Sequence, residues 1–413
     1  MITSVLIFFI IALTIGLWAI DCDGVVKIEW LHYNIEINIL FALCIIAIIF
    51  LCIILLVRLV FYIFQCFYSY KKHQQEKRIM LLDQGYMYLN CGNIEKADKC
   101  ITKLHKFNHP SLFLLKGRFY FDNNKYALAE KYFTQFTQVV PIIDPALGIH
   151  LLNHINRIED QSYQLTLFRK MLEVFYKQSW SAIFKLEICR ISRDWNTAIE
   201  EMHKIIKLKI NVPYDTQEML CIFYYALAKQ HYTYQKYDDA LQVLDNIKHY
   251  SKYRIPIILL KAQLCVSTNK QRKAIQLLES EYRTNPHPDI ANFYLEVMHH
   301  DSQAIHKLYN INNDYYFSTY LIAQDAINLG EYNIAMKYLN NVFNSKTYIS
   351  LRFLMIKLKV LLQDHTELLY WTDKTMKDAI VDQYWQCKQC KCVPINWNYE
   401  CDNCKGFNTI VWV

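Results

Sequence analysis

Glycine and proline are scarce in this sequence of 413 residues, with 8 of each. Neither G-x-G-x-x-G nor G-x-x-x-x-G-K-[ST] occurs, so the usual glycine-rich cradles for nucleotides and flavins are missing. The H-E-x-x-H pattern of zinc proteases, the G-x-S-x-G nucleophile elbow and a convincing acid–base pair are missing too. We therefore expect that the protein is not an enzyme.

Charged side chains are also few, at 20% of residues, and 45 basic against 38 acidic residues leave a net charge of +7. A nucleic-acid-binding chain gathers basic residues on one face. No such concentration is present, so nucleic acid is not an expected partner. Hydrophobic residues make up 53% of the chain, and with so few helix breakers this composition predicts an all-α protein of two or three domains.

Cysteine is comparatively frequent, with 14 residues, and four of these form two C-x-x-C pairs near the C-terminus. Most of the others lie within apolar or helical stretches, where a free cysteine behaves as a small hydrophobic residue. These are Cys44, Cys52, Cys66, Cys91, Cys100, Cys189, Cys221 and Cys265. Their distribution indicates a reducing compartment for the body of the protein.

Two stretches near the N-terminus, residues 2–20 and 37–57, contain no charged side chain. Each is long enough to cross the hydrocarbon core of a bilayer, and the second stays apolar to about residue 68. We predict a two-span transmembrane hairpin over residues 1–77. No Lys or Arg precedes the first stretch and no A-x-A-like site follows it, so a retained anchor is favoured over a cleaved signal peptide.

The charges around these stretches predict the orientation of the hairpin. The intervening loop holds four acidic residues and one lysine, whereas the second stretch is followed by Arg58, Lys71, Lys72, Lys77 and Arg78. Because positive residues stay on the cytoplasmic side, we expect both termini in the cytoplasm and a short periplasmic loop. The loop contains no second cysteine with which Cys22 could pair. Cys22 is therefore either a free thiol or part of a disulfide between two copies of the chain.

The loop and its flanks resemble a known family. The stretch "DGVVKIEWLHYNIE" between two apolar segments resembles the N-terminal region of HemY-type inner-membrane proteins encoded with haem-synthesis genes. The residues that carry the resemblance are Gly24, Val26, Ile28, Trp30, Tyr33, Ile35 and Glu36. It implies a multi-pass protein of the bacterial inner membrane, linked to tetrapyrrole metabolism and to late haem-pathway enzymes as partners.

Residues 78–375 contain a repeated pair of small residues, twelve positions apart. The five pairs are Gly85 and Ala97, Gly117 and Ala129, Ala228 and Ala240, Ala262 and Ala274, and Ala323 and Ala335. A tetratricopeptide unit needs small residues at these two places, because its two antiparallel helices approach most closely there. We therefore predict a TPR-like α-solenoid, with degenerate repeats over residues 142–190.

Such a solenoid presents a concave face, lined by the first helix of each pair, that binds peptides or proteins. Tyrosine is frequent, with 31 residues, and several tyrosines fall on predicted first helices. These residues either anchor a partner or pack between repeats. The tyrosines concerned are Tyr224, Tyr225, Tyr315, Tyr316 and Tyr320.

The C-terminal cysteines have the spacing of a metal site. Cys387 and Cys390 form one C-x-x-C turn, and Cys401 and Cys404 form another ten residues later. Two facing turns of this kind present four thiolates tetrahedrally to a metal. Cys392 offers a sulfur in place of Cys390, but C-x-x-C geometry favours Cys390.

Residues 384–413 resemble a rubredoxin-like ribbon, in which either zinc or iron fits. Four thiolates leave no open position for water or substrate, so a structural role is expected. A membrane span, tetratricopeptide repeats and such a ribbon also resemble lipopolysaccharide assembly protein B, a family with one span. We expect the ribbon at the far end of the array as a docking element, and an array whose stability does not depend on it.

These observations predict a non-enzymatic, membrane-anchored scaffold that acts through protein–protein interactions. The resemblance implies that its targets are haem-pathway enzymes. A regulatory adaptor in envelope or lipopolysaccharide assembly is the alternative. A redox enzyme built on an iron ribbon is a third hypothesis.

Overall fold

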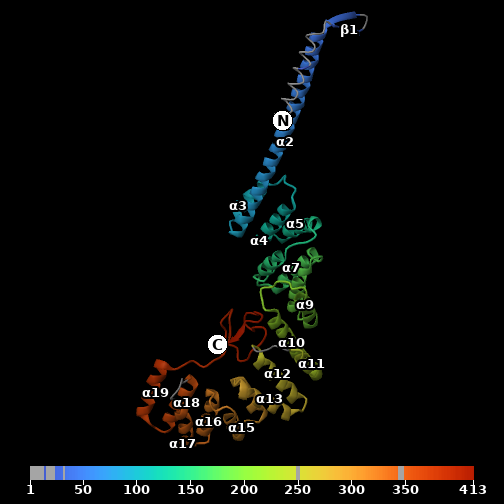
Figure 1. Ribbon diagram of the computed structural model, residues 1–413. Helices are drawn as coiled ribbons and strands as arrows, with labels where there is room; N and C mark the ends of the chain where they lie inside the picture. Colours follow the sequence, from blue (N-terminus) through green and yellow to red (C-terminus); the bar gives the residue numbers. More distant parts are fainter. Residues whose placement is uncertain (1–13, 15–23, 31–32, 248–251, 343–347) are drawn as a thin grey trace. The chain divides into compact units, whose positions relative to one another are not determined.

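The computed structural model describes residues 14, 24–30, 33–247, 252–342 and 348–413 (Figure 1). The first predicted span, residues 2–20, lies outside these residues except for Thr14, and Cys22 lies outside them too. The chain divides into two compact units, Met1–Val139 and Val140–Val413. Each is described separately below.

The first unit begins with a β-hairpin where the sequence predicted only a loop. Strands β1 (Val25–Trp30) and β2 (Tyr33–Asn38) pair antiparallel, so that Lys27 lies opposite Glu36. The Lys27 Nζ and Glu36 Oε1 atoms are 2.5 Å apart. Apolar residues alternate with polar ones along both segments, which is the pattern of a β-strand. The hairpin could have been predicted from this alternation.

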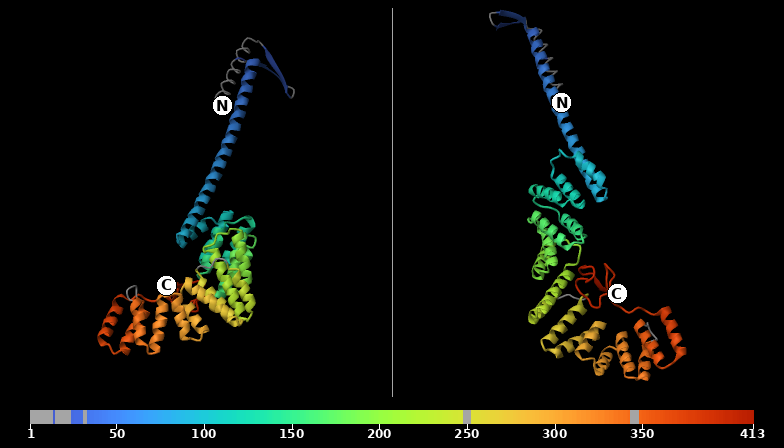
Figure 2. Two further views of the ribbon diagram at one scale, coloured as in Figure 1. Left: turned by 60° about the horizontal axis from the view of Figure 1, so that its bottom comes forward. Right: turned by 180° about the vertical axis from the view of Figure 1, so that it is seen from behind.

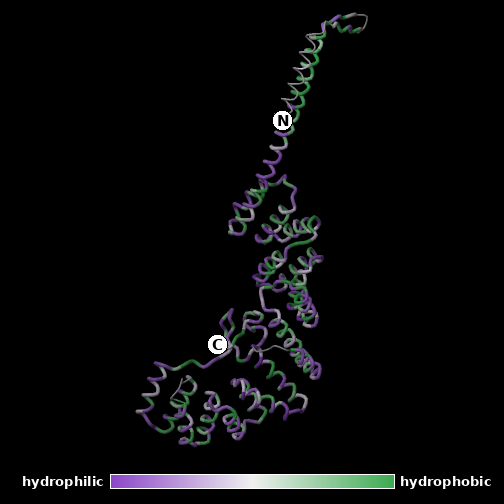
Figure 3. Tube along the Cα trace, viewed as in Figure 1, coloured by the Kyte–Doolittle hydropathy of each residue, from purple (hydrophilic) through white to green (hydrophobic). Residues whose placement is uncertain are grey.

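Helix α2 (Ile39–Asn90) follows directly and is 52 residues long. Its stretch from Phe41 has a mean hydropathy of 3.3 in its most apolar window, and none of that window is buried. Figure 3 shows apolar residues along the part of α2 next to the hairpin and polar residues further on. Among the described residues, α2 is the one helix that is both long enough and apolar enough to cross a membrane. The predicted two-span hairpin is therefore not confirmed.

Helix α2 also passes through the predicted domain boundary between residues 77 and 78 without a break. No glycine or proline occurs between Ile39 and Gln84, so nothing in the sequence ends the helix there. Leu82 and Leu89, near its end, are buried in the core of the first repeat. The membrane-type helix and the first helix of the array are therefore one continuous element.

The rest of the first unit consists of α3 (Ile94–Lys103), α4 (Pro110–Asp122) and α5 (Tyr126–Val139). A Cβ atom added to Gly85 would lie 2.8 Å from Leu115, and one added to Gly117 would lie 2.5 Å from Phe133. Both glycines therefore stand where the helices leave no room for a side chain. This confirms the reason for which small residues were expected there.

The second unit contains the remaining helices and a small two-stranded ribbon (Figure 2). The helices are α6 (Pro145–Ile155), α7 (Gln161–Val174), the 3-10 helix η1 (Ser179–Ser181), α8 (Ala182–Ser192), α9 (Trp195–Lys207), α10 (Thr216–Thr233), α11 (Tyr237–Asp245), α12 (Arg254–Ser267), α13 (Gln271–Thr284), α14 (Pro288–Val297), α15 (Ser302–Ile311), α16 (Tyr316–Asn328), α17 (Tyr332–Val342), α18 (Ile349–Leu361) and α19 (His365–Asp378).

Consecutive helices pair through very short turns, as the repeat pattern predicted. Several pairs are joined by a residue in the left-handed backbone region, which reverses the chain within two or three residues. These residues include Gly92, Asn124, Arg193, Gln235, Asn269, Gly330 and Gln363. The alanines of the predicted small pairs are all fully buried between helices: Ala97, Ala129, Ala228, Ala240, Ala262, Ala274, Ala323 and Ala335.

The ribbon, with strands β3 (Trp385–Cys387) and β4 (Ile410–Trp412), does not extend the far end of the array, so that expectation was wrong. After α19 the chain turns back: the N–H of Ile349 donates to the carbonyl of Ile380, and the Ser350 hydroxyl donates to Asp382 at 2.8 Å. Figure 1 and the right view of Figure 2 show the ribbon on the inner side of the arc formed by α10–α19.

Candidate metal centre

The structure brings together the four cysteines that the sequence singled out. The sulfur atoms of Cys387, Cys390, Cys401 and Cys404 all lie within 4.8 Å of one another. Two sulfur pairs, Cys387 with Cys404 and Cys390 with Cys401, are each 3.7 Å apart. With zinc–sulfur bonds of about 2.3 Å, the edge of a tetrahedral site measures roughly 3.8 Å, so this donor set fits a metal ion of that kind.

The two turns that present these sulfurs are built alike. The N–H of Lys391 donates to the carbonyl of Cys387 at 2.9 Å, and the N–H of Lys405 donates to that of Cys401 at 2.8 Å. Both lysines have a left-handed backbone, with φ of 62° and 56°. Pairing of β3 with β4 places Cys387 opposite Ile410, and this fixes the first turn relative to the end of the chain.

Electrostatics distinguish Cys390 from its neighbour Cys392. The Asn403 side chain and the backbone N–H of Cys392 lower the pKa of the Cys390 thiol to about 5. A hydrogen bond to Cys401 is the main cause that raises the pKa of the Cys392 thiol to about 12. The Cys390 thiol is thus the more acidic of the two.

The cluster also needs a counter-charge. Burial is the main cause that raises the pKa of the Cys404 thiol to about 12, and its hydrogen bonds with Cys390, Cys387 and Cys401 raise it further. A divalent cation removes this obstacle, since a metal-bound thiol is deprotonated outright. The four cysteines could therefore hold a metal ion as a closed four-thiolate set.

The ribbon does not stand free but shares a core with the helices of the array. Its buried residues Trp385, Cys387, Trp397, Cys401 and Ile410 belong to the same apolar cluster as residues of α10, α11 and α12. Two of the candidate metal ligands are therefore themselves part of the packing between ribbon and array. Sequence reasoning expected the tryptophans to pack around the ribbon's own loops, and it missed their contacts with the helices.

Trp397 is the central contact. Its ring lies 5.1 Å from that of Tyr225 on α10 and 5.4 Å from that of Tyr253, just before α12. Its indole N–H donates to the carbonyl of Ile410 at 3.2 Å, which ties the ring to the ribbon. Tyr225 had been considered as an anchor for a partner, and here it holds the chain's own ribbon.

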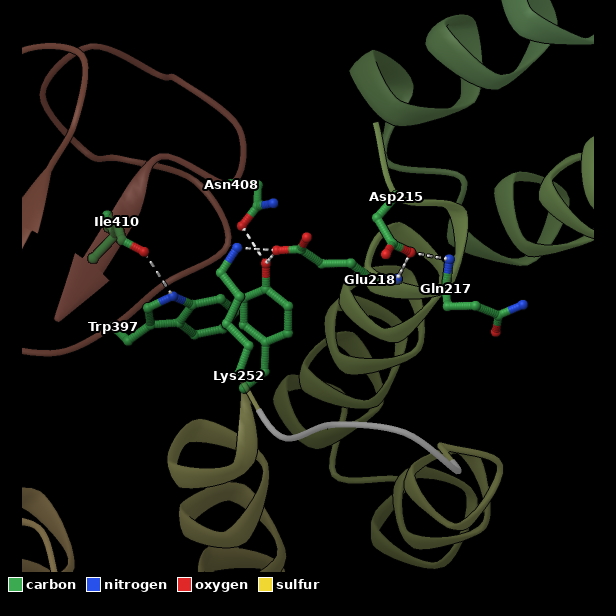
Figure 4. A network of polar contacts seen from close by, with 8 residues as sticks. Asp215, Gln217, Glu218, Lys252, Trp397, Asn408 and Ile410 are labelled. Carbon is green, nitrogen blue, oxygen red and sulfur yellow. Dashed lines mark hydrogen bonds and ion pairs between the residues drawn. The ribbon is translucent and has the colours of Figure 1, made fainter. Parts of the chain in front are cut away.

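A polar network accompanies this contact (Figure 4). Glu218 on α10 receives hydrogen bonds from the Tyr253 hydroxyl and the Lys252 ammonium group. The Tyr253 hydroxyl also lies 2.8 Å from the amide oxygen of Asn408 in the ribbon. Asp215 accepts hydrogen bonds from the first N–H groups of α10 and so fixes the start of that helix.

The second turn of the ribbon reaches α8, α9 and α10. The ring of Phe407 lies 6.2 Å from that of Trp195 and 5.9 Å from that of Phe223. Glu400 pairs with Arg193 at 3.2 Å. These partners are more than 170 residues apart in sequence from the ribbon, so no local pattern could have revealed them.

Both strands of the ribbon contact the start of α14. The indole N–H of Trp385 donates to Asp289 at 2.8 Å, and the ring of Trp412 lies 4.1 Å from that of His287. His287 is only 7% exposed, and this burial lowers its pKa to about 4. In total, the ribbon bridges helices from α8 to α14.

Comparison with known proteins supports the N-terminal resemblance. Residues 24–116 match the family model described as HemY protein N-terminus. The resemblance to HemY-type proteins, based on residues 24–36, is thereby confirmed, and the match includes the hairpin, α2 and the first repeat. Among curated proteins, no sequence matches the chain.

Solved structures that are similar to the chain include helical-repeat proteins. Yeast Tom70 is 13% identical over 73% of this chain and 85% of its own, with a TM-score of 0.28. A tetratricopeptide repeat protein from Parabacteroides merdae is 13% identical over 74% and 94%, with a TM-score of 0.23. Naa15/Naa10 bound to HypK-THB is 11% identical over 71% and 57%, with a TM-score of 0.35.

Proposed function

We propose that this HemY-type chain is a membrane-anchored scaffold that gathers other proteins and does not itself catalyse a reaction. The observation that carries the proposal is the continuity of α2, which combines an exposed apolar stretch with the first helix of the array. A helix of 52 residues has a length of about 78 Å, whereas a hydrocarbon core takes up about 30 Å. The remainder of α2 therefore joins the apolar stretch to the first repeat without a flexible linker.

Binding is favoured over catalysis for two reasons. The sequence lacks the common catalytic and nucleotide-binding motifs, and paired helices of this type build extended binding surfaces. The candidate metal site also consists of four protein sulfurs, which leaves no coordination position for water or a substrate. We propose zinc as the metal and a structural role for it.

The same four sulfurs could also bind iron, and an iron site would support the hypothesis that the protein is a redox enzyme. The two metals are easily told apart, because an iron–thiolate site absorbs visible light and zinc does not. A purified chain that is colourless and contains about one zinc ion would support the structural role. A coloured chain with a reversible reduction potential would overturn it in favour of electron transfer.

The link to haem biosynthesis rests on the HemY resemblance alone. From it we propose late haem-pathway enzymes as partners, in the inner membrane of a bacterium. We propose further that both termini are cytoplasmic, because the basic residues follow the apolar part of α2. An impermeant thiol reagent applied to intact spheroplasts should then label Cys22 and leave Cys91, which is exposed beyond α2, unlabelled. Labelling of Cys91 would contradict this topology.

Partner identity is tested by chemical crosslinking in intact membranes followed by affinity purification of the full-length chain. Haem-pathway enzymes should be recovered above the level seen with an unrelated inner-membrane protein. A matched variant, Trp397→Ala, disturbs the surface that ribbon and array build together, and a partner that binds there should be lost. Recovery of envelope or lipopolysaccharide-assembly factors in place of haem enzymes would favour the alternative scaffold.

A further inference from the structure

The metal cluster contains one more sulfur than a tetrahedral site uses. Cys392 belongs to neither C-x-x-C pair, yet its sulfur lies 3.4 Å from that of Cys401. This is shorter than the 3.7 Å between Cys390 and Cys401 and the 3.7 Å between Cys387 and Cys404. A surplus thiol therefore directly touches a candidate ligand.

The position of Cys392 leaves it room to move. It is half-buried, whereas Cys401 is completely buried. The loop that follows it is exposed, with Val393 at 60% and Ile395 at 90%. A disulfide requires a sulfur–sulfur distance of about 2.05 Å, so the two atoms would have to approach by roughly 1.4 Å, which a change of side-chain rotamer in a surface loop can supply.

We propose that Cys392 and Cys401 form a disulfide when a peroxide oxidises the cluster, and that this reaction expels the metal. The proposal rests on the metal site of the proposed function. It adds a modification site to that function, namely a redox-controlled release of the ion on which the ribbon depends. Cys392 is then the thiol that the peroxide oxidises, and Cys401 is the ligand that is withdrawn.

The chemistry balances as follows. The Cys392 sulfur, the more exposed of the two, attacks one peroxide oxygen, the O–O bond breaks, and the Cys392 proton leaves with the hydroxide as water, so that a sulfenic acid forms at Cys392. The Cys401 thiolate then attacks the sulfenic sulfur, the S–O bond breaks, and the departing hydroxide takes a proton from solvent to form a second water. Two sulfurs lose two electrons in all, and the peroxide gains them.

The site connects this reaction to the array. Cys401 follows Glu400, which pairs with Arg193, and Tyr399, whose ring lies 5.5 Å from that of Trp195. Withdrawal of Cys401 from the metal therefore acts on the segment that holds the ribbon against α8 and α9. Oxidation should loosen this edge of the ribbon, and reduction with fresh metal should restore it.

The test uses the full-length chain in detergent, loaded with zinc and treated with hydrogen peroxide. Zinc release is followed with a chromogenic chelator, and disulfides are mapped by mass spectrometry of peptides. We expect a disulfide between Cys392 and Cys401, formed in step with zinc release and reversed by dithiothreitol and zinc. In Cys392→Ser, zinc should stay bound before oxidation and be released at least about tenfold more slowly.

Cys91→Ser is the matched control, because it removes an exposed thiol outside the cluster and should release zinc like the unaltered chain. Equal release rates in Cys392→Ser and the unaltered chain, or a disulfide between other cysteines, would overturn the proposal. Loss of zinc from untreated Cys392→Ser would show that Cys392 is a ligand. A chain that never binds zinc would refute the metal site, while disulfide mapping would still test the cysteine pair.

Discussion

The repeats in contact with the ribbon and the repeats beyond it are built from the same helical pairs but are held together differently. Among the residues that the structure describes, the core of α16–α19 is formed by residues of those helices and their turns, such as Ala323, Leu351 and Trp371. The core of α10–α12 also includes Trp397 and Cys401, from more than 130 residues further along the chain. Neighbour-to-neighbour packing therefore describes the end of the array but not its middle.

This difference shows that the small ribbon is a structural part of the solenoid. The ribbon alone has two strands of three residues each, too few to bury a core of its own. It gains its apolar environment from the helices, and the helices gain a brace across several repeats. Metal binding and the stability of the middle repeats should consequently depend on each other.

The largest effect is expected from removing the metal with Cys387→Ser and Cys404→Ser together. The ribbon should unfold, because structural zinc contributes on the order of 10 kcal/mol to small folds. Hydrogen exchange should then accelerate in α10, α12 and α14 but not in α16 and α18. This replaces the sequence-based expectation that the whole array would keep its stability without the ribbon.

The control for this experiment is Cys265→Ser, which alters a buried thiol of α12 outside the ribbon. It should retain the metal and the exchange rate of α10, the helix that Trp397 of the ribbon contacts. Unchanged exchange throughout the array after metal loss would show that the middle repeats do not need the ribbon, and the contrast between the two regions would disappear.

A second prediction concerns Trp397→Ala. Truncating a buried tryptophan typically costs about 3–5 kcal/mol, and Trp397 is 7% exposed. The loss of stability should appear in α10–α12. Metal binding should also weaken, because the Trp397 ring joins Tyr225 and Tyr253 of the array to the Ile410 carbonyl of the ribbon. Differential scanning calorimetry and a zinc titration would measure the two effects.

Trp371→Ala provides the counterpart at the end of the array, since Trp371 is 8% exposed and packs within the cluster of α16–α19. A stability loss of similar size is expected there, but with zinc affinity unaltered. Weaker zinc binding in Trp371→Ala would mean that the two regions are coupled after all.

Acid should weaken the ribbon's contact with α14. Burial lowers the pKa of His287 from 6.5 to about 4, so between these values the unfolded chain binds a proton that the folded chain does not. Stability is then full above pH 6.5 and falls as the pH drops toward 4, by on the order of 3 kcal/mol. Asp289, whose pKa is raised by burial, offsets part of this loss at the acidic end.

The comparison with His287→Asn isolates this contribution, because Asn also caps a helix but does not titrate. The variant should lose less stability than the unaltered chain between pH 6.5 and pH 4.5 in chemical denaturation. Identical pH profiles would exclude His287 as the cause. Lys229 and Glu218, which lie at other ribbon contacts, are left unchanged in both chains.

Much of this structure could be predicted from the sequence, because the decisive signals were local. The pairs of small residues gave the helical hairpins, and two C-x-x-C turns gave the four clustered sulfurs. The place of the ribbon could not be predicted, since the contacts of Phe407 and Trp397 with distant helices leave no periodic trace. The continuity of α2 was readable from the lack of any breaker between Ile39 and Gln84, but the change from apolar to polar residues suggested a boundary.

The smallest effect is expected from the ion pair of Arg193 and Glu400, at the edge of the ribbon. The Arg193 side chain is 62% exposed, so water and salt screen the attraction, and pairs of this kind contribute about 0.2–1 kcal/mol. A double-mutant cycle with Arg193→Ala and Glu400→Ala should give a coupling free energy in that range, measured by denaturation of the zinc-loaded chain. The coupling should shrink further in 0.5 M salt.

The pair Lys377–Asp373 within α19, also exposed, serves as the control and should leave zinc affinity unaltered when removed. A coupling of several kcal/mol between Arg193 and Glu400 would mean that charge holds this edge of the ribbon. A coupling of at most about 1 kcal/mol together with a large loss of stability in Phe407→Ala would assign the attachment to aromatic packing. Because Phe407 contacts Trp195 and Phe223 on two different helices, that second outcome is the one expected.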